Sequence, residues 1–460
     1  MKRGISYGLI AAAIAVGGAL GCSPGAASPS NNVVRIPLEI RTLTLRNGMR
    51  VILDEDHRSP TIAVGVSYRV GSRNDPAGRS GLAHFVEHIG FLGSAHVGNG
   101  DHFKLLNEAG ATDTNAFTDA DRTYYFETVP SDSLDLALWL ESDRMGFFAA
   151  NVDQATFDNE RRVVKNEHHE RVDDRKEGLV VLLERERLFP EGHPYHRHAI
   201  GVLTDLDDTT LDDVRKFHAT YYTPSNATLV LVGDFDPARA SASIAKYFAS
   251  LPKGPDAPTP PKATATLQGE KRVVVEAAVD WPSIHVAWAM PAAGDRDEPA
   301  IRIALNSICN LVRYWQVYEH TNAREASCWY EADQLGGVAE IGFTLNASTS
   351  FDDVLSSIDT ALSDTSNGRF GSVSLAVTRN SSELMFGFEG FSHRANRFTW
   401  YDQVANNPLF LGKELRRYAA VGRADMNDAR ERYFPAQNRV VIYVKAVPSA
   451  PVAGRVVSEK

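Results

Sequence analysis

Residues 84–88 read His-Phe-Val-Glu-His, so that two histidines stand four positions apart with a glutamate just before the second. In an α-helix, residues four apart share a face, and both imidazoles can then reach one metal ion. Glu87 lies near the same face and can take a proton from a water molecule beside that metal. Ser80 and Gly81 suit a helix start, and no proline follows. The stretch predicts a metal-binding helix; the alternative is a surface helix that carries two histidines.

A third ligand is needed, and residues 157–167 offer one. This segment has the composition of a helix, and Glu160 and Glu167 are seven positions apart, two turns along one face. Val163 and Val164 indicate that one side of the helix is packed. Glu160 and Glu167 are both candidates, and three neighbours remain rivals for the role: His168, His169 and Glu170.

The surrounding chain divides into two similar halves. A proline-rich stretch, residues 251–264, has neither helical nor strand periodicity and reads as a linker between residues 34–250 and 265–447, with a tail at 448–460. Residues 60–75 and 282–297 both contain a proline, an alternating β-branched run and a Gly/Asp/Arg cluster. Because both lie near the start of their halves, duplication is the better interpretation.

Each half shows both strand and helix patterns. Residues 49–53 and 62–70 alternate as half-buried strands do, and residues 228–233 form a short apolar run that ends in glycine. Residues 134–145 place apolar side chains at helical spacing. The sequence therefore predicts an α+β protein of two domains.

Composition excludes several classes of protein. The 460 residues are 43% hydrophobic and 23% charged, which is unlike a disordered chain, a fibre or a polytopic membrane protein. With 48 basic and 58 acidic residues the net charge is −10, which argues against nucleic-acid binding.

The first 33 residues read as an export signal followed by a tether. Residues 1–21 contain a basic start and a short apolar run, and Ala19 to Cys22 resemble a bacterial lipoprotein box. Removal of residues 1–21 takes away Lys2 and Arg3, so that the mature charge is −10 − 2 = −12. We expect acylation of Cys22 and a periplasmic location at the outer membrane, with ordinary signal cleavage as the alternative. Whether Cys309 and Cys328 pair is left open by the sequence.

Together these motifs resemble the pitrilysin (insulysin) family of zinc peptidases, which includes the mitochondrial processing peptidases. The similarity covers almost the whole mature chain, and residues 81–91 are close to the signature helix of the family, which has an inverted H-x-x-E-H motif. The other matching segments fall in the expected order, namely residues 45–51, 71–74, 193–195, 200–201, 221–224 and 232–234. The resemblance implies two homologous α/β sandwich domains, each an antiparallel sheet with helices on one side, forming half of a clam-shell chamber.

The resemblance also implies roles for individual residues. His84, His88 and Glu167 would bind one Zn²⁺ per chain, Glu87 would be the general base, and Glu160 would orient a ligand from behind. Residues 111–118 look like the edge strand to which an extended peptide adds in the family. The substrate-binding residues would be Asn115, Ala116 and Phe117.

The C-terminal half departs from the family pattern. Active members have an Arg and a Tyr seven residues apart that bind substrate and stabilise the oxyanion, whereas Arg324 and Tyr330 are six apart here. A misplaced oxyanion donor costs about 10²–10³ in rate. We therefore expect a related subunit that lacks the zinc motif to supply the pair in a heterodimer, with a homodimer as second choice.

The sequence is compatible with two functions of different classes. The first is a zinc endopeptidase that cleaves extended peptides, and the intact Glu87 favours it. The second is a weakly active or inactive peptide-binding or assembly subunit, which the altered region around Arg324 and Tyr330 favours.

Overall fold

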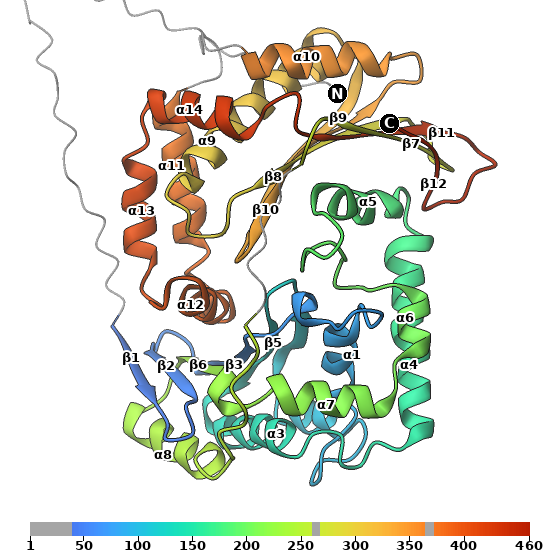
Figure 1. The fold of residues 1–460 in the computed structure, drawn as a ribbon. Helices are drawn as coiled ribbons and strands as arrows, with labels where there is room; N and C mark the ends of the chain where they lie inside the picture. Colours follow the sequence, from blue (N-terminus) through green and yellow to red (C-terminus); the bar gives the residue numbers. More distant parts are fainter. Residues whose placement is uncertain (1–38, 260–266, 364–371) are drawn as a thin grey trace, which may run out of the picture. The chain divides into compact units, whose positions relative to one another are not determined.

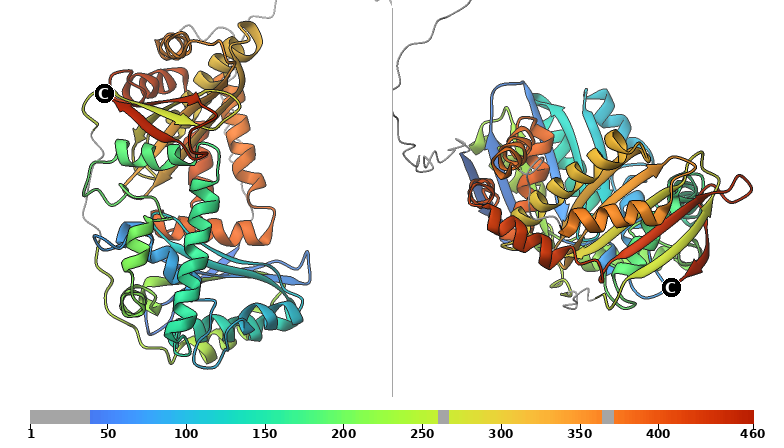
Figure 2. Two further views of the ribbon diagram at one scale, coloured as in Figure 1. Left: turned by 90° about the vertical axis from the view of Figure 1, so that its right-hand side faces the viewer. Right: turned by 90° about the horizontal axis from the view of Figure 1, so that it is seen from above.

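The computed structural model describes residues 39–259, 267–363 and 372–460. The predicted leader, Cys22 and residues 260–264 of the predicted linker lie outside these ranges. The described chain contains two six-stranded sheets, shown one above the other in the left view of Figure 2. The domain limits drawn from the sequence stay predictions.

The N-terminal sheet has the strand order β1-β2-β6-β3-β5-β4, which leaves β4 at an edge. Its strands are β1 (Ile40–Thr44), β2 (Arg50–Glu55), β3 (Thr61–Tyr68), β4 (Thr112–Thr118), β5 (Thr123–Pro130) and β6 (Ala227–Gly233). The helices of this half are α1 (Leu82–Ile89), α2 (Asp101–Glu108), α3 (Leu134–Gly146), α4 (Gln154–His168), α5 (Gly178–Leu188), α6 (Leu203–Asp208), α7 (Leu211–Tyr221) and α8 (Pro237–Phe248).

The C-terminal sheet has the strand order β12-β7-β11-β8-β10-β9. Its strands are β7 (Lys271–Ala277), β8 (Ser283–Met290), β9 (Ala323–Asp333), β10 (Gly336–Leu345), β11 (Val440–Ala446) and β12 (Arg455–Glu459). The helices are α9 (Glu298–Arg313), α10 (Phe351–Ser363), α11 (Val373–Phe386), α12 (Phe391–Ala405), α13 (Leu411–Ala419) and α14 (Arg423–Tyr433).

The two sheets have the same topology. The order β2-β6-β3-β5-β4 in the first corresponds to β7-β11-β8-β10-β9 in the second, as expected for a duplicated unit. The prediction of purely antiparallel sheets was wrong in one respect: β2 pairs with β6, and β7 with β11, in parallel. In each set of five corresponding strands, the parallel pair joins the first strand to the last. The rest of the repeat lies between these two strands and makes the crossover that a parallel pair requires.

Each half lends one helix to the other (Figure 1). Helix α12 packs on β3 and β6 of the N-terminal sheet, and α5 packs on β8 and β11 of the C-terminal sheet. The prediction of helices on one side only was therefore wrong. On β6, alternate side chains face two different apolar clusters, Leu229 and Leu231 the first and Val230 and Val232 the second. A strand buried on both faces reads as a continuous apolar run, as residues 228–233 do.

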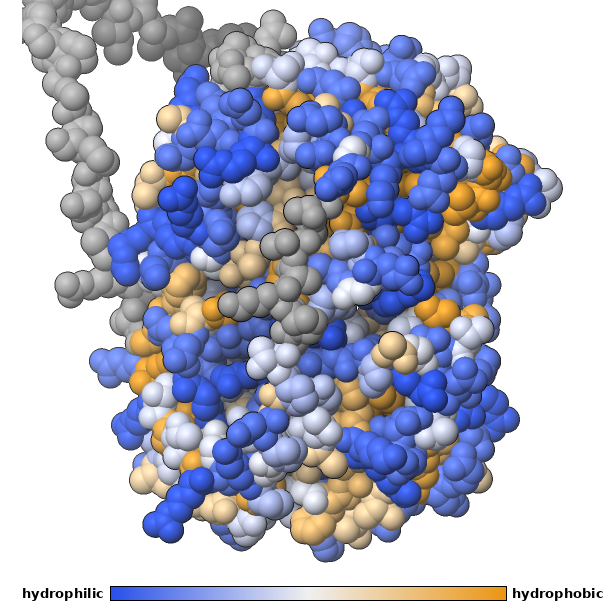
Figure 3. Space-filling model, viewed as in Figure 1, coloured by the Kyte–Doolittle hydropathy of each residue, from blue (hydrophilic) through white to orange (hydrophobic). Residues whose placement is uncertain are grey.

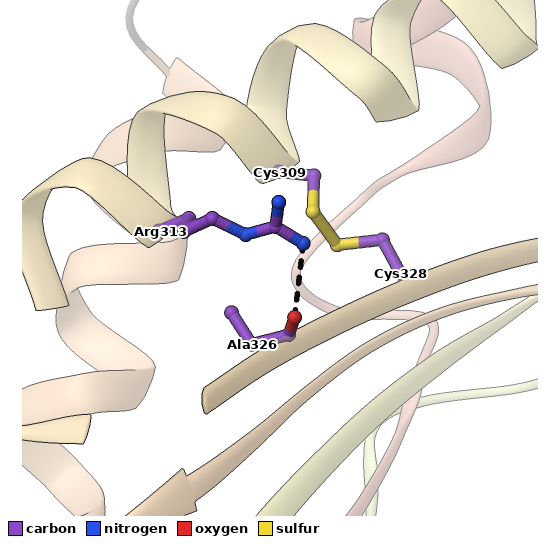
Figure 4. Close-up of a disulfide and its surroundings, with 4 residues drawn as sticks. All are labelled: Cys309, Arg313, Ala326 and Cys328. Carbon is purple, nitrogen blue, oxygen red and sulfur yellow. Dashed lines mark hydrogen bonds between the residues drawn. A yellow bond between two sulfur atoms is a disulfide. The ribbon is translucent and has the colours of Figure 1, made fainter. Parts of the chain in front are cut away.

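Two of the three cysteines form a disulfide in the C-terminal half (Figure 4). Cys309 in α9 joins Cys328 in β9 across 19 residues, with Cα atoms 6.3 Å apart. Beside it, Arg313 donates a hydrogen bond of 2.9 Å to the carbonyl oxygen of Ala326. The start of β9 is thus tied to the end of α9 at two points.

On the face drawn in Figure 3, hydrophilic residues are spread between small groups of hydrophobic ones. No helix within residues 39–259, 267–363 and 372–460 is long and apolar enough to cross a membrane.

Asp402 of α12 joins the two halves, and its replacement tests this packing. Its buried carboxylate accepts hydrogen bonds from Arg50, Arg69 and Thr228 of the N-terminal half. Asp402→Ala should lower the free energy of unfolding by about 2–3 kcal/mol, because two partly buried guanidinium groups lose their shared carboxylate. Urea unfolding followed by circular dichroism measures this.

The control is Asp428→Ala, at an exposed position of α14, with an expected change below about 0.5 kcal/mol. Equally small changes in both variants would contradict the role given to Asp402.

Candidate active site

Helix α1 is fixed at its start and along its buried side. The carboxylate of Asp75 accepts hydrogen bonds of 2.8 Å from the backbone N–H groups of Gly81 and Ala83, which have no partner inside the helix. Gly81 has a φ of +87°, which favours glycine. Phe85 stacks on Phe157 of α4 with ring centroids 5.1 Å apart. This stack sets the position of the predicted metal helix against the helix of the predicted third ligand.

The structure brings His84, His88 and Glu167 together. Oε2 of Glu167 lies 3.0 Å from Nε2 of His88 and 3.5 Å from Nε2 of His84. One ligand atom from each residue lies within 4.8 Å of the other two. The helical spacing therefore places both imidazoles at one carboxylate, as the sequence predicts.

Glu160 orients His88 from behind. Its Oε1 lies 2.9 Å from Nδ1 of His88, so Nδ1 carries the proton of the neutral ring and Nε2 is left as a ligand. The carboxylate thus selects the tautomer that a metal site requires.

Burial and mutual contacts shift the pKa of each of the three groups. Burial, with the nearby His88, lowers the pKa of His84 to about 3. Burial also lowers the pKa of His88, but hydrogen bonds to Glu160 and Glu167 outweigh it and raise the pKa to about 9. Burial raises the pKa of Glu167, yet the bond to His88 and the two imidazoles lower it to about 2. His84 is therefore neutral near pH 7.

These residues fit a zinc ion. Two imidazole nitrogens and one carboxylate are a ligand set of catalytic zinc sites, which keep a further position for water. Nδ1 of His84 is buried without a hydrogen-bond partner, so hydrogen bonds within the protein do not fully satisfy this ring. His169 pairs with Asp173 instead, and none of the predicted rivals His168, His169 and Glu170 lines the cavity around Glu167.

Glu87 lies next to this donor set. It is buried, and burial raises its pKa to about 7, although a hydrogen bond from Thr118 lowers it. The Thr118 hydroxyl donates to Oε2 at 2.5 Å. One oxygen of Glu87 is thereby held, and the other remains for proton transfer.

A cavity of about 450 Å³ joins these residues to the edge strand. Asn115, Ala116 and Phe117 of β4 line it together with the metal donors and Glu87. The expected edge position of this strand is confirmed, because β4 pairs only with β5 in the described sheet. The strand irregularity between Thr112 and Asn115 lies at the same place.

Among the cavity residues that sequence reasoning did not assign are three polar ones, Thr118, Arg171 and His198. Thr118 lies two positions after Ala116 and so points to the same side of β4, and the alternation along the strand therefore gave a signal for it. Arg171 lies one turn after Glu167 and forms an ion pair of 2.7 Å with it. His198 accepts a hydrogen bond at Nδ1 from the backbone of Ile200, and nothing in its spacing indicated the cavity.

Arg324 and Tyr330 lie in β9, at the edge of the other sheet, and do not line this cavity. The Arg324 guanidinium lies 3.9 Å from the ring centre of Trp281. Arg302 lies over the ring of Tyr330, whose hydroxyl is buried. Within one chain, the structure does not bring this pair to the metal donors.

Known proteins share the family and the fold of this chain. Residues 50–189 match the insulinase family (peptidase family M16), and residues 208–381 match the peptidase M16 inactive domain. The chain is 32% identical over 282 residues to the zinc protease PqqE of Helicobacter pylori, which covers 59% of this chain and 60% of that protein. It thus spans about three fifths of this curated relative.

Solved structures agree. A protease from Helicobacter pylori superimposes with a TM-score of 0.79 at 25% identity, over 89% of this chain and 100% of that one. Pitrilysin shares the fold with a TM-score of 0.74 at 18% identity, and the match covers 93% of this chain but 47% of pitrilysin. The chain corresponds to half of a pitrilysin-like structure. It belongs to the M16 family of pitrilysin- and insulinase-type zinc peptidases.

Proposed function

We propose that this chain is a zinc endopeptidase that cleaves extended peptides. The observation that carries the proposal is the convergence of His84, His88 and Glu167 beside Glu87 in one cavity. When bound there, one Zn²⁺ supplies a Lewis acid that makes water a nucleophile near neutral pH and polarises the scissile carbonyl.

Substrate binding is assigned to β4. An extended peptide adds to the free edge of this strand through main-chain hydrogen bonds, which are indifferent to side chains. Asn115, Ala116 and Phe117 then face the bound segment, since they line the cavity. This brings the peptide backbone next to the metal donors.

Glu87 moves the proton. Its carboxylate accepts a proton from the attacking water and delivers it to the leaving amine. Thr118 holds Oε2 of Glu87 and keeps the carboxylate directed at the reacting atoms. We therefore assign Glu87 as general base and acid and Thr118 as its positioning residue.

Glu87→Gln tests the proposal. The amide keeps the size of the side chain but cannot accept the proton, so peptide hydrolysis should fall by about 10²–10⁴. A quenched fluorescent peptide library measures the rate, and metal analysis should find the zinc at this site unchanged. Activity retained in the Gln variant would exclude Glu87 as the base.

Thr118→Val tests the positioning residue. Loss of a hydrogen bond to a charged group should reduce kcat by roughly tenfold, with KM and zinc content little altered. Thr118→Ser keeps the hydroxyl and should restore most of the rate. A fall in zinc content, or an equal loss in the Ser variant, would assign Thr118 a purely structural role.

We further propose that the active form is a heterodimer with a related subunit that lacks the zinc motif. Two observations support it: the chain matches half of pitrilysin, and Arg324 and Tyr330 lie away from the cavity. Hydrolysis by the mature chain should require addition of its nearest encoded paralogue. Full activity of the isolated monomer would contradict this partner.

A peptide-binding or assembly subunit without activity is the second candidate function. The match of residues 208–381 to the M16 inactive domain and the place of Arg324 and Tyr330 favour it. Bound zinc without hydrolysis, alone or with the paralogue, would be its signature.

We also propose export and anchoring through an acylated Cys22, on the evidence of the leader-like residues 1–21. The enzyme would then act on peptides on the periplasmic side of a bacterial membrane.

A further inference from the structure

A second cluster of metal-ligating groups lies where α5 meets the C-terminal sheet (Figure 1). His285 of β8 has Nδ1 3.0 Å from Oε1 of Glu340 in β10, and Nε2 3.1 Å from Oε2 of Glu177, the residue before α5. Glu184 of α5 completes the group: one ligand atom each from Glu184, His285 and Glu340 lies within 4.8 Å of the others. We call these four residues the α5 cluster.

The α5 cluster contains three carboxyl groups and one imidazole. In the described part of the chain, no lysine or arginine forms an ion pair with Glu177, Glu184 or Glu340. Arg185, which follows Glu184 in the chain, forms ion pairs with Glu331 and Asp333. Burial and the neighbouring Glu340 raise the pKa of Glu184. Burial lowers the pKa of His285, but hydrogen bonds to Glu177 and Glu340 outweigh it and raise the pKa, so that protons rather than a lysine or arginine balance the charge of the cluster.

Glu184 is the most buried carboxyl group of the cluster. It is only 2% exposed, and its Oε1 has no hydrogen-bond partner. A buried carboxylate oxygen without a partner is costly. Trp329 donates a hydrogen bond of 2.7 Å to Oε2 of Glu340, which holds that carboxylate in place and leaves its Oε1 facing His285.

The corresponding junction in the other half is balanced without a metal. There α12 packs on the N-terminal sheet, and the carboxylate of Asp402 meets the guanidinium groups of Arg50 and Arg69. Helix α5 likewise brings a carboxyl group, Glu184, to its junction, but the sheet there offers the imidazole of His285 and the carboxylate of Glu340 in place of guanidinium groups.

A third buried group, His102, Glu127 and Glu141, lacks this character. Its atoms also lie within 4.8 Å of one another, but Arg144 forms an ion pair with Glu141 and supplies a resident cation. The α5 cluster has no such guanidinium.

The backbone at the α5 cluster is unusual as well. Glu177 has a φ of +60°, in the left-handed region that non-glycine residues seldom adopt. This conformation accompanies the approach of its carboxylate to His285. Backbone strain of this kind is found at ligand sites.

We propose that Glu184, His285 and Glu340 bind a divalent transition-metal ion, with Glu177 as a neighbouring carboxylate. Imidazole nitrogen with carboxylate oxygens suits Zn²⁺ or Mn²⁺. The ion takes the place of a proton on His285, which has carboxylates at both ring nitrogens in the metal-free state. It ties α5 of the N-terminal half to strands β8 and β10.

Metal content of five proteins tests this site separately from the peptidase site. After incubation with Zn²⁺ and dialysis, mass spectrometry should find two zinc ions per wild-type chain and one in His88→Ala. The double variant Glu184→Gln/Glu340→Gln should also hold one, and the combination of all three substitutions none. Glu186→Gln, on the same helix but outside the cluster, is the control and should hold two.

Thermal unfolding of His88→Ala shows whether this variant is folded and whether it binds zinc. Added Zn²⁺ should raise its Tm by several degrees, because a ligand bound only to the folded state stabilises it. A single zinc in the wild type that is lost in His88→Ala, with no shift on addition of Zn²⁺, would overturn the second site. Zinc lost only with Glu184 and Glu340 would instead overturn the peptidase site and leave this one standing.

Discussion

Two imidazoles and a carboxylate, all largely removed from water, are held within reach of one another, and much of the N-terminal half serves to hold them there. Buried polar donors at this spacing repay their desolvation only when a cation or a full set of hydrogen bonds satisfies them. The protein meets the constraint in three ways. Asp75 fixes the start of α1, the Phe85–Phe157 stack fixes α1 against α4, and Glu160 fixes the ring of His88. In the proposed function, zinc completes a set of donors that the fold has already assembled.

The contact between the halves rests on a second buried group. Asp121, fully buried, accepts hydrogen bonds from Arg73 at 2.7 Å and from the Tyr195 hydroxyl at 2.6 Å. It also accepts one of 2.6 Å from the backbone N–H of Gln334 in the turn between β9 and β10. Arg73 and Tyr195 belong to the motifs that resemble the family, and their role is to dock the C-terminal half beside the active-site half.

The sequence predicted those parts of the structure that depend on local spacing. His84 and His88 follow from the helical repeat, and the duplication follows from two similar stretches in equal halves. Glu167 was separated from its rivals His168 and His169 by family spacing alone, because all three lie within one turn of the same helix. The structure separates them by direction, since only Glu167 faces the two imidazoles.

The remaining features depend on contacts between residues far apart in the chain. The sequence does not show that α5 and α12 each pack on the sheet of the other half. A central strand such as β6 is apolar on both faces, so its sequence does not indicate which helix covers each face. The contact of Thr118 with Glu87 was missed because the two residues are 31 positions apart in the chain. The pairing of Cys309 with Cys328 needed the place of α9 against β9, which no local pattern supplies.

The central claim is that α1 and α4 together form a zinc site. Anomalous diffraction at the zinc absorption edge, from crystals of the mature chain, tests it most directly. The account predicts a peak among Nε2 of His84, Nε2 of His88 and a carboxylate oxygen of Glu167, at about 2.0–2.2 Å from each. Crystals grown with zinc that show no peak there, and in which His88 remains paired with Glu167, would contradict the claim.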